Sequence, residues 1–302
     1  MRFLYFIFAF LITTCLFFSA CKKTEQITQN ITQDTVLTGN APPDYNGTPS
    51  VIIENYVNKV YIDLIGEEPN DTELTDNVAY LKNNDLSVQA KDSVVKKVIY
   101  TKQYYNRLYD IEKSEMLEGI DSISIAGQIY LLELQKAIYQ DSGKTQLLQL
   151  FDDEIRRLTN LQTAPMDYYN GTITLSGFYE VLINNPIYDE LNMGSENFVN
   201  SCFENLLHRL PTVAELADGI EMVDGNPSAL FNEEGNSKGD YIKIITTSTA
   251  FYEGMVYDGY QRFLVRDPTS TEVYAESDSV QTSNDIQLLH RIILKKEEYA
   301  GF

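Results

Sequence analysis

Three stretches of this chain carry one helical pattern that ends at a proline, and this repetition constrains the fold more than any other feature. The stretches begin at Val57, Val199 and Val256 and align without a gap. In each, apolar residues recur at positions i, i+4, i+7 and i+8, which places them on one face of an α-helix. A helix interior does not accept proline, and each pattern meets one, at Pro69, Pro211 and Pro268. The sequence therefore predicts three helices that each end before a proline turn.

Each proline is followed by a signal for a new helix. A residue with a capping side chain stands three positions before a glutamate, as Asn70 before Glu73, Thr212 before Glu215 and Thr269 before Glu272. This is the spacing of a capping box, in which the two side chains satisfy free backbone amides of the first helical turn. The predicted unit is a helix, a proline turn and a capped helix.

A second apolar pattern, with steps of three, seven and three residues, closes each unit. It starts at Val95, Ile242 and Leu289, and a fourth copy starts at Phe178. Because these steps keep to one side of a 3.6-residue period, the pattern predicts one face of a further helix.

Together the patterns predict an all-α protein of stacked helical repeats, since each unit needs neighbours to bury its apolar face. We expect a first repeat in residues 51–110 and a second half with two further repeats in residues 166–302. Residues 111–165 fit neither pattern but keep a helical period, which predicts an inserted helical hairpin. Met255 directly precedes Val256, so adjoining units are expected to share a continuous helix.

The N-terminus has the features of an export signal. Arg2 precedes an apolar run from Phe3 to Phe18, which is too short for a stable membrane-spanning helix. Ser19-Ala20-Cys21 then resembles the lipobox of bacterial lipoproteins. That resemblance implies removal of residues 1–20 and acylation of Cys21 with fatty acids such as palmitate. The alternative is an ordinary signal peptide with a fortuitous cysteine.

Residues 21–50 are rich in Thr, Gln, Asn and Asp and have no periodic pattern. Such a composition buries too little apolar surface to order itself, so it predicts a flexible tether. More than one acyl chain gives stable anchoring without a membrane-spanning helix. We therefore expect a protein that is lipid-anchored to the outer membrane and faces the cell surface, with the periplasmic face as the alternative.

The repeat motif itself resembles a known family. Helices that end in L-L-x-R-x-P-T-x-x-E-L, as around Arg209 and Arg266, are similar to a bacterial helical repeat of unknown function in surface and secreted proteins. That repeat is similar in turn to phycobilisome-linker-like domains. The first copy departs from the family pattern because Glu67 replaces the arginine. The other two copies carry His208 and Val265 at the position where the family usually has glycine, which the first copy keeps as Gly66. The resemblance implies a non-catalytic domain that joins or presents other proteins, with no cofactor and no catalytic residue.

Composition agrees with a non-catalytic protein. The chain has 23 Lys and Arg against 44 Asp and Glu, a formal charge of −21, which excludes a nucleic-acid partner because phosphates need clustered cations. Its 2 His and 3 Cys form no metal-binding or nucleophilic motif. We expect His208 and His290 at the surface or at helix ends, and Cys202 as a buried, inert thiol.

Two weaker signals concern cations and sugars. The segment Asp224–Asp240 is acidic, yet Ala229 and Gly235 stand where a calcium loop of the EF-hand type needs Gly and Glu. A solvated acidic loop is therefore favoured over a calcium site. Thr35, in an Asp-Thr-Val sequence within the tether, matches an O-glycosylation pattern of some Gram-negative bacteria, and the alternative there is an ordinary turn.

These features favour a non-enzymatic scaffold or accessory subunit of an outer-membrane or cell-surface complex for transport, export or assembly. The alternative is a surface lipoprotein that binds a glycan or another nutrient. A concave site lined by exposed tyrosines would favour that alternative. An enzyme is the least favoured class.

Overall fold

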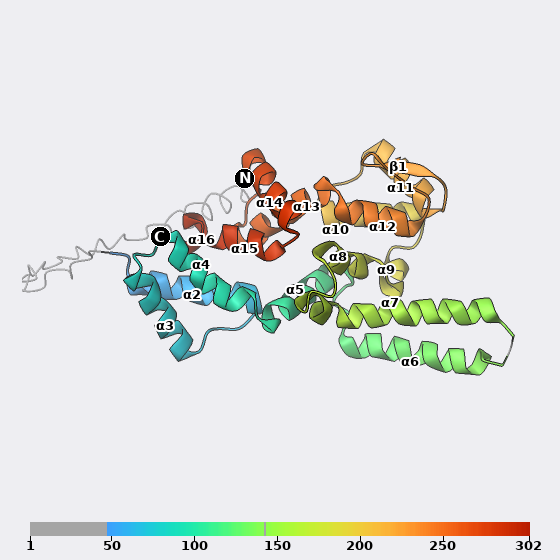
Figure 1. Cartoon of the computed structure of the whole chain (residues 1–302), viewed down its shortest axis with the longest axis horizontal. Coiled ribbons are helices and arrows are strands. Elements are labelled where there is room, and N and C mark those ends of the chain that lie inside the picture. The colour runs from blue at the N-terminus through green and yellow to red at the C-terminus, as the bar shows by residue number, and fades with distance from the viewer. Residues whose placement is uncertain (1–46, 142) are drawn as a thin grey trace, which may run out of the picture. The chain divides into compact units, whose positions relative to one another are not determined.

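Helices form nearly all of the regular structure in the computed structural model, which describes residues 47–302 except residue 142 (Figure 1). The predicted all-α class is confirmed, while the stacking of repeats stays a prediction. No helix in this described part is both long and apolar enough to span a bilayer. Cys21 and Thr35 lie outside the described residues.

The first four helices correspond to the first predicted repeat. They are α2 (Ser50–Ile65), α3 (Asp71–Asn83), α4 (Val88–Ile99) and α5 (Lys102–Met116). A hairpin of two long helices follows, α6 (Ser122–Tyr139) and α7 (Thr145–Tyr169). It begins later than residue 111, because α5 continues to Met116.

The second half begins with two short helices, α8 (Leu175–Ile183) and α9 (Pro186–Leu191). The remaining helices are α10 (Ser195–Leu207), α11 (Val213–Val223), α12 (Lys238–Thr247), α13 (Thr249–Leu264), α14 (Ser270–Ser283), α15 (Ile286–Leu294) and α16 (Glu297–Ala300). Helix α13 runs through the Met255–Val256 junction, so the predicted continuous helix is confirmed.

The second apolar pattern does not form a single helix, which corrects the prediction. In each copy the step of seven residues crosses a break between two helices: α4 and α5, α8 and α9, α12 and α13, or α15 and α16. At three of these breaks a capping residue starts the second helix, namely Thr101, Asn185 and Ser248. The Ser248 hydroxyl, for example, accepts the Phe251 amide at 3.1 Å. The chain turns there because the cap replaces the hydrogen bond that a continued helix would make.

One continuous apolar core joins the described helices. Helix α13 packs against α10, α12, α14, α15 and α16, and α4 packs against α15. Residues near both ends of the described chain therefore share one core. The hydroxyl of Tyr56 in α2 donates to the carbonyl of Leu294 in α15 at 3.3 Å.

Candidate functional site

All three proline turns share one backbone geometry. The helix before each turn is capped by a left-handed residue: Gly66 at φ 75°, His208 at φ 51° and Val265 at φ 56°. The sequence differences at this position therefore leave the turn unchanged. After Pro69, Pro211 and Pro268 a capping box starts the next helix, as predicted for Glu73, Glu215 and Glu272.

The arginines of the motif bind the glutamates of the capping boxes. Arg209 donates two hydrogen bonds to Glu215, at 2.9 and 2.6 Å, and its guanidinium lies 5.0 Å from the Phe203 ring centroid. Arg266 does the same with Glu272, at 3.1 and 3.0 Å, and also binds Glu298. These bidentate pairs tie each turn to the first turn of the helix that follows it.

The ion pairs change the acidity of the two glutamates. The Arg209 guanidinium is the main reason why the pKa of Glu215 falls to about 2, and Arg266 lowers the pKa of Glu272 in the same way. Because these folded-state values lie below the unfolded value, the stabilisation is complete above about pH 4.5 and is lost as the pH falls through the lowered pKa. Glu67 replaces the arginine in the first turn, so Glu73 lacks this partner. The motif residues thus make structural contacts within each turn.

Loss of one cap should destabilise the protein measurably. The Thr212 hydroxyl accepts the Glu215 amide at 3.3 Å, so Thr212→Ala leaves that amide without its partner. We expect a loss of about 0.5–2 kcal/mol in unfolding free energy, measured by denaturant titration. Thr212→Ser keeps the hydroxyl and is the matched control. Equal stability of the Thr212→Ala variant and the wild type would show that the Thr212 cap does not stabilise the helix.

A glycine in the third turn should stabilise the protein. Val265 is β-branched and has a left-handed backbone conformation, a combination that costs roughly 1–2 kcal/mol. Val265→Gly removes this steric cost but raises the conformational entropy of the unfolded chain. We therefore expect a net increase of about 1 kcal/mol in unfolding free energy and a higher melting temperature. Val265→Ala keeps a Cβ and should recover less. A lower melting temperature for the glycine variant would show that Val265 is not strained.

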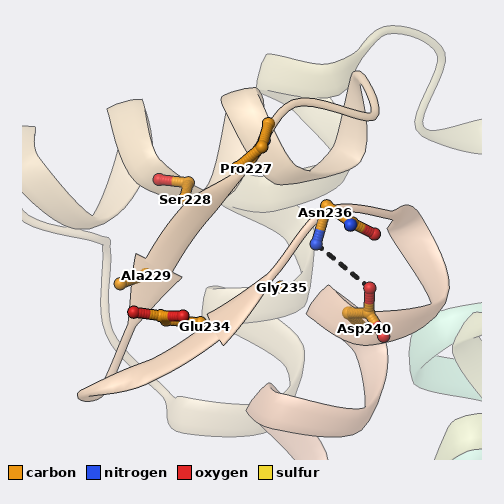
Figure 2. Close-up of a pocket in the computed structure, with 7 residues that line it drawn as sticks. All are labelled: Pro227, Ser228, Ala229, Glu234, Gly235, Asn236 and Asp240. Atoms are coloured by element: carbon orange, nitrogen blue, oxygen red, sulfur yellow. Dashed lines mark hydrogen bonds between the residues drawn. The ribbon is translucent and has the colours of Figure 1, made fainter.

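The acidic segment Asp224–Asp240 forms a small hairpin, where the sequence predicted only a loop. Strands β1 (Ser228–Leu230) and β2 (Glu233–Gly235) pair antiparallel, with Ala229 opposite Glu234. The hairpin and the start of α12 line a hollow of about 530 Å³. Figure 2 shows seven of its lining residues.

The Asp240 carboxylate at this hollow is already hydrogen-bonded to neighbouring residues of the chain. Asp240 Oδ2 accepts the Asn236 amide at 3.0 Å (Figure 2). The same oxygen also accepts the Ser237 hydroxyl, at 2.7 Å. No tyrosine is among its lining residues. Within the described residues, no group of three or more His, Cys, Asp or Glu side chains has an arrangement that could hold a metal ion.

The two histidines differ in their exposure to solvent. His208 is exposed at the end of α10, as predicted. His290 is fully buried in α15, so its predicted surface position is wrong. Its Nδ1 lies 2.9 Å from the Tyr104 hydroxyl, and its ring packs edge-on against Phe263. Burial lowers the pKa of His290 well below its usual value, so it stays neutral. The sequence missed this because the helices that cover His290 lie far away along the chain.

Cys202 is buried, as predicted. Burial raises the pKa of its thiol to about 12, and the Tyr188 hydroxyl lies 3.7 Å from its Sγ. Because the thiolate is the reactive form of cysteine, Cys202 is inert at neutral pH.

A group of carboxylates between α5 and α13 was not predicted. Glu112 is buried, and burial, together with Asp258 and Glu115, raises its pKa well above the usual value. Arg262 acts in the opposite direction. Glu112, Glu115 and Asp258 line a very small hollow of about 10 Å³ together with His208 and Tyr179. This space holds at most one water molecule, so the group is a polar contact at the edge of the core, with only Glu112 buried, rather than a ligand site.

Helix α6 carries more large exposed apolar side chains than any other helix of the described part. Its inner face, with buried Ile125, packs against α7. Its outer face exposes large apolar side chains: Ile123 (84%), Tyr130 (68%), Leu131 (56%), Leu134 (48%) and Ile138 (69%). We call these five residues, together with Gly127 on the same face, the α6 stripe. Figure 1 shows α6 on the outer side of α7.

The α6 stripe is the candidate functional site, because a helix that is apolar on both faces is normally buried on both. Monomeric proteins rarely expose a contiguous apolar surface of this kind unless it binds something. The helical period of residues 122–139 was visible in the sequence, but which face would remain uncovered was not.

No protein-family model, curated protein or solved structure matches this chain. The resemblance of its motif to linker-like repeats therefore stays a prediction.

Proposed function

We propose that this protein is a non-enzymatic lipoprotein, anchored to the outer membrane through Cys21 and exposed at the cell surface, that acts as a scaffold or accessory subunit of a membrane protein complex. The observation that supports the proposal is the α6 stripe. Five large apolar side chains on one helix face are about half to four-fifths exposed within the described residues. Burial of such a face against another protein is favourable by about 25 cal/mol per Å² of apolar surface.

The surroundings of the stripe also favour a protein partner. Within α6 the charged residues are Glu133 and Lys136, and Lys136 is paired with Asp152 of α7 at 2.5 Å. The face is therefore close to neutral in a chain of net charge −21. An apolar, uncharged helix face binds protein surfaces by desolvation rather than by charge attraction.

Purification from native membranes tests the scaffold proposal. Tagged protein, extracted in mild detergent, should retain a stoichiometric protein partner, and a variant with Leu131→Glu and Ile138→Glu should lose it. Val213→Glu, which places the same charge on another exposed apolar residue, is the matched control. His208→Ala should also retain the partner. Recovery of the same species from all four proteins would refute a role for the stripe in partner binding.

The proposed anchor has a separate test. Cys21→Ala should move the protein from the detergent phase to the aqueous phase of a phase-separating detergent extract, because loss of the acyl chains removes the membrane affinity. The matched control is Cys15→Ala, which changes the cysteine inside the apolar run and should leave the protein in the detergent phase. Equal partition of the Cys21→Ala variant and the wild type would refute lipidation at Cys21.

A further inference from the structure

We propose that the α6 stripe is covered by the α6 stripe of a second copy of this chain, packed antiparallel about a two-fold axis between Tyr130 and Leu131. The inference rests on the proposed function only in taking the stripe to be a protein-binding surface. It goes further by naming the occupant.

The spacing of the stripe is the first argument. Its members are Ile123, Gly127, Tyr130, Leu131, Leu134 and Ile138, separated by steps of four, three, one, three and four residues. This series reads the same in both directions. An antiparallel copy therefore places Ile123 against Ile138, Tyr130 against Leu131, and Gly127 against Leu134. A two-fold interface requires this kind of self-complementary patch.

Gly127 supplies a second argument through its conformational cost. It lies in the interior of α6, where a glycine costs about 0.5–1 kcal/mol relative to alanine. A Cβ placed on Gly127 would meet nothing within 4 Å, and its backbone is ordinary helix. The chain itself therefore gives no reason for glycine at this position. In the antiparallel pair, the large side chain of Leu134 fills the space above Gly127, whereas a parallel pair would leave two glycines facing each other.

Charge also favours this surface for self-association. A second copy carries the same net charge of −21, so most of its surface repels the first. Because α6 is close to neutral, its outer face avoids this repulsion. Salt screens the remaining long-range repulsion, so added salt should tighten the dimer. A complex with a basic partner would weaken instead.

The size of the contact sets its strength. A helix of 18 residues is about 27 Å long and about 10 Å wide. Such a footprint is smaller than the roughly 800 Å² per partner of a standard interface. We therefore expect a reversible dimer whose population depends on concentration. Confinement to one membrane would raise the effective concentration and favour it.

Sedimentation of the purified protein over a wide concentration range tests the dimer. The wild type should shift from monomer to dimer, and Leu134→Glu should weaken association by at least about tenfold because it buries a charge. Val213→Glu should dimerise as the wild type does. A wild type that stays monomeric at every concentration, or a Leu134→Glu variant that dimerises normally, would overturn the proposal. A monomeric wild type that still retains a membrane partner through the stripe would leave the proposed function standing.

Two further variants test the antiparallel arrangement. Gly127→Leu should raise the melting temperature of the monomer and yet weaken the dimer, and this opposite pair of effects would not arise from a structural role alone. Ile123→Cys and Ile138→Cys proteins, when mixed and oxidised, should give crosslinked peptides that join position 123 to position 138. Crosslinks that join each position to itself, or a Gly127→Leu dimer of unchanged affinity, would overturn the arrangement.

Discussion

Gly254→Ala should destabilise the protein by about 3 kcal/mol or more, at the severe end of overpacking substitutions. Helix α13 crosses the end of α10 at this glycine. A Cβ there would fall on the carbonyl oxygen of Leu206, closer than any real Cβ contact, and 2.9 Å from the Cα of Leu207. Both neighbours are backbone atoms, so no side-chain rotation relieves the contact and the two helices must separate. Chemical denaturation, monitored by circular dichroism, measures the loss.

Gly127→Ala is the matched control for this substitution. Both glycines are helical, but Gly127 has nothing within 4 Å of the added carbon. The same change there should stabilise the protein by about 0.5–1 kcal/mol through helix propensity. Opposite signs for the two variants would establish that α10 and α13 touch at Gly254. A mild effect at Gly254, similar to that at Gly127, would show that the helices do not approach so closely.

Glu112→Gln should stabilise the protein, and the gain should grow with pH. The pKa of Glu112 is raised above the unfolded value by burial and by Asp258 and Glu115. Its favourable contribution is therefore complete below about pH 4.5 and is lost as the pH rises through the folded-state pKa. Over that interval the wild type should lose up to about 1.4 kcal/mol per pH unit from this group. Glutamine keeps the shape of the protonated side chain and does not titrate.

Unfolding titrations at about pH 4.5 and about pH 8 measure this difference. The variant and the wild type should agree in acid and diverge at the higher pH. Glu253→Gln changes an exposed carboxylate on α13 and serves as the control for loss of one negative charge. If the stability difference were equal at both pH values, Glu112 would not be held protonated in the folded protein.

The sequence alone determined those features that depend on neighbouring residues. Helix ends at Pro69, Pro211 and Pro268 and the capping boxes at Thr212 and Thr269 were predicted correctly, because caps and prolines act within one helical turn. The same local rules would have revealed the breaks before α5, α9 and α13, since capping residues stand there. The apolar spacing crossed those breaks without interruption and concealed them.

The tertiary structure decided what each helix faces. His290 is buried by Tyr104 and Phe263, and Glu112 lies near Asp258, because the core brings together segments far apart along the chain. Nothing local distinguishes a buried histidine or glutamate from an exposed one. For α6 the sequence showed a helical period, which predicts a helix but not the face that neighbouring elements cover. Only the packing of α7 against one face revealed that the other is open, because burial depends on which elements meet in space, and spacing along one helix cannot specify its neighbours.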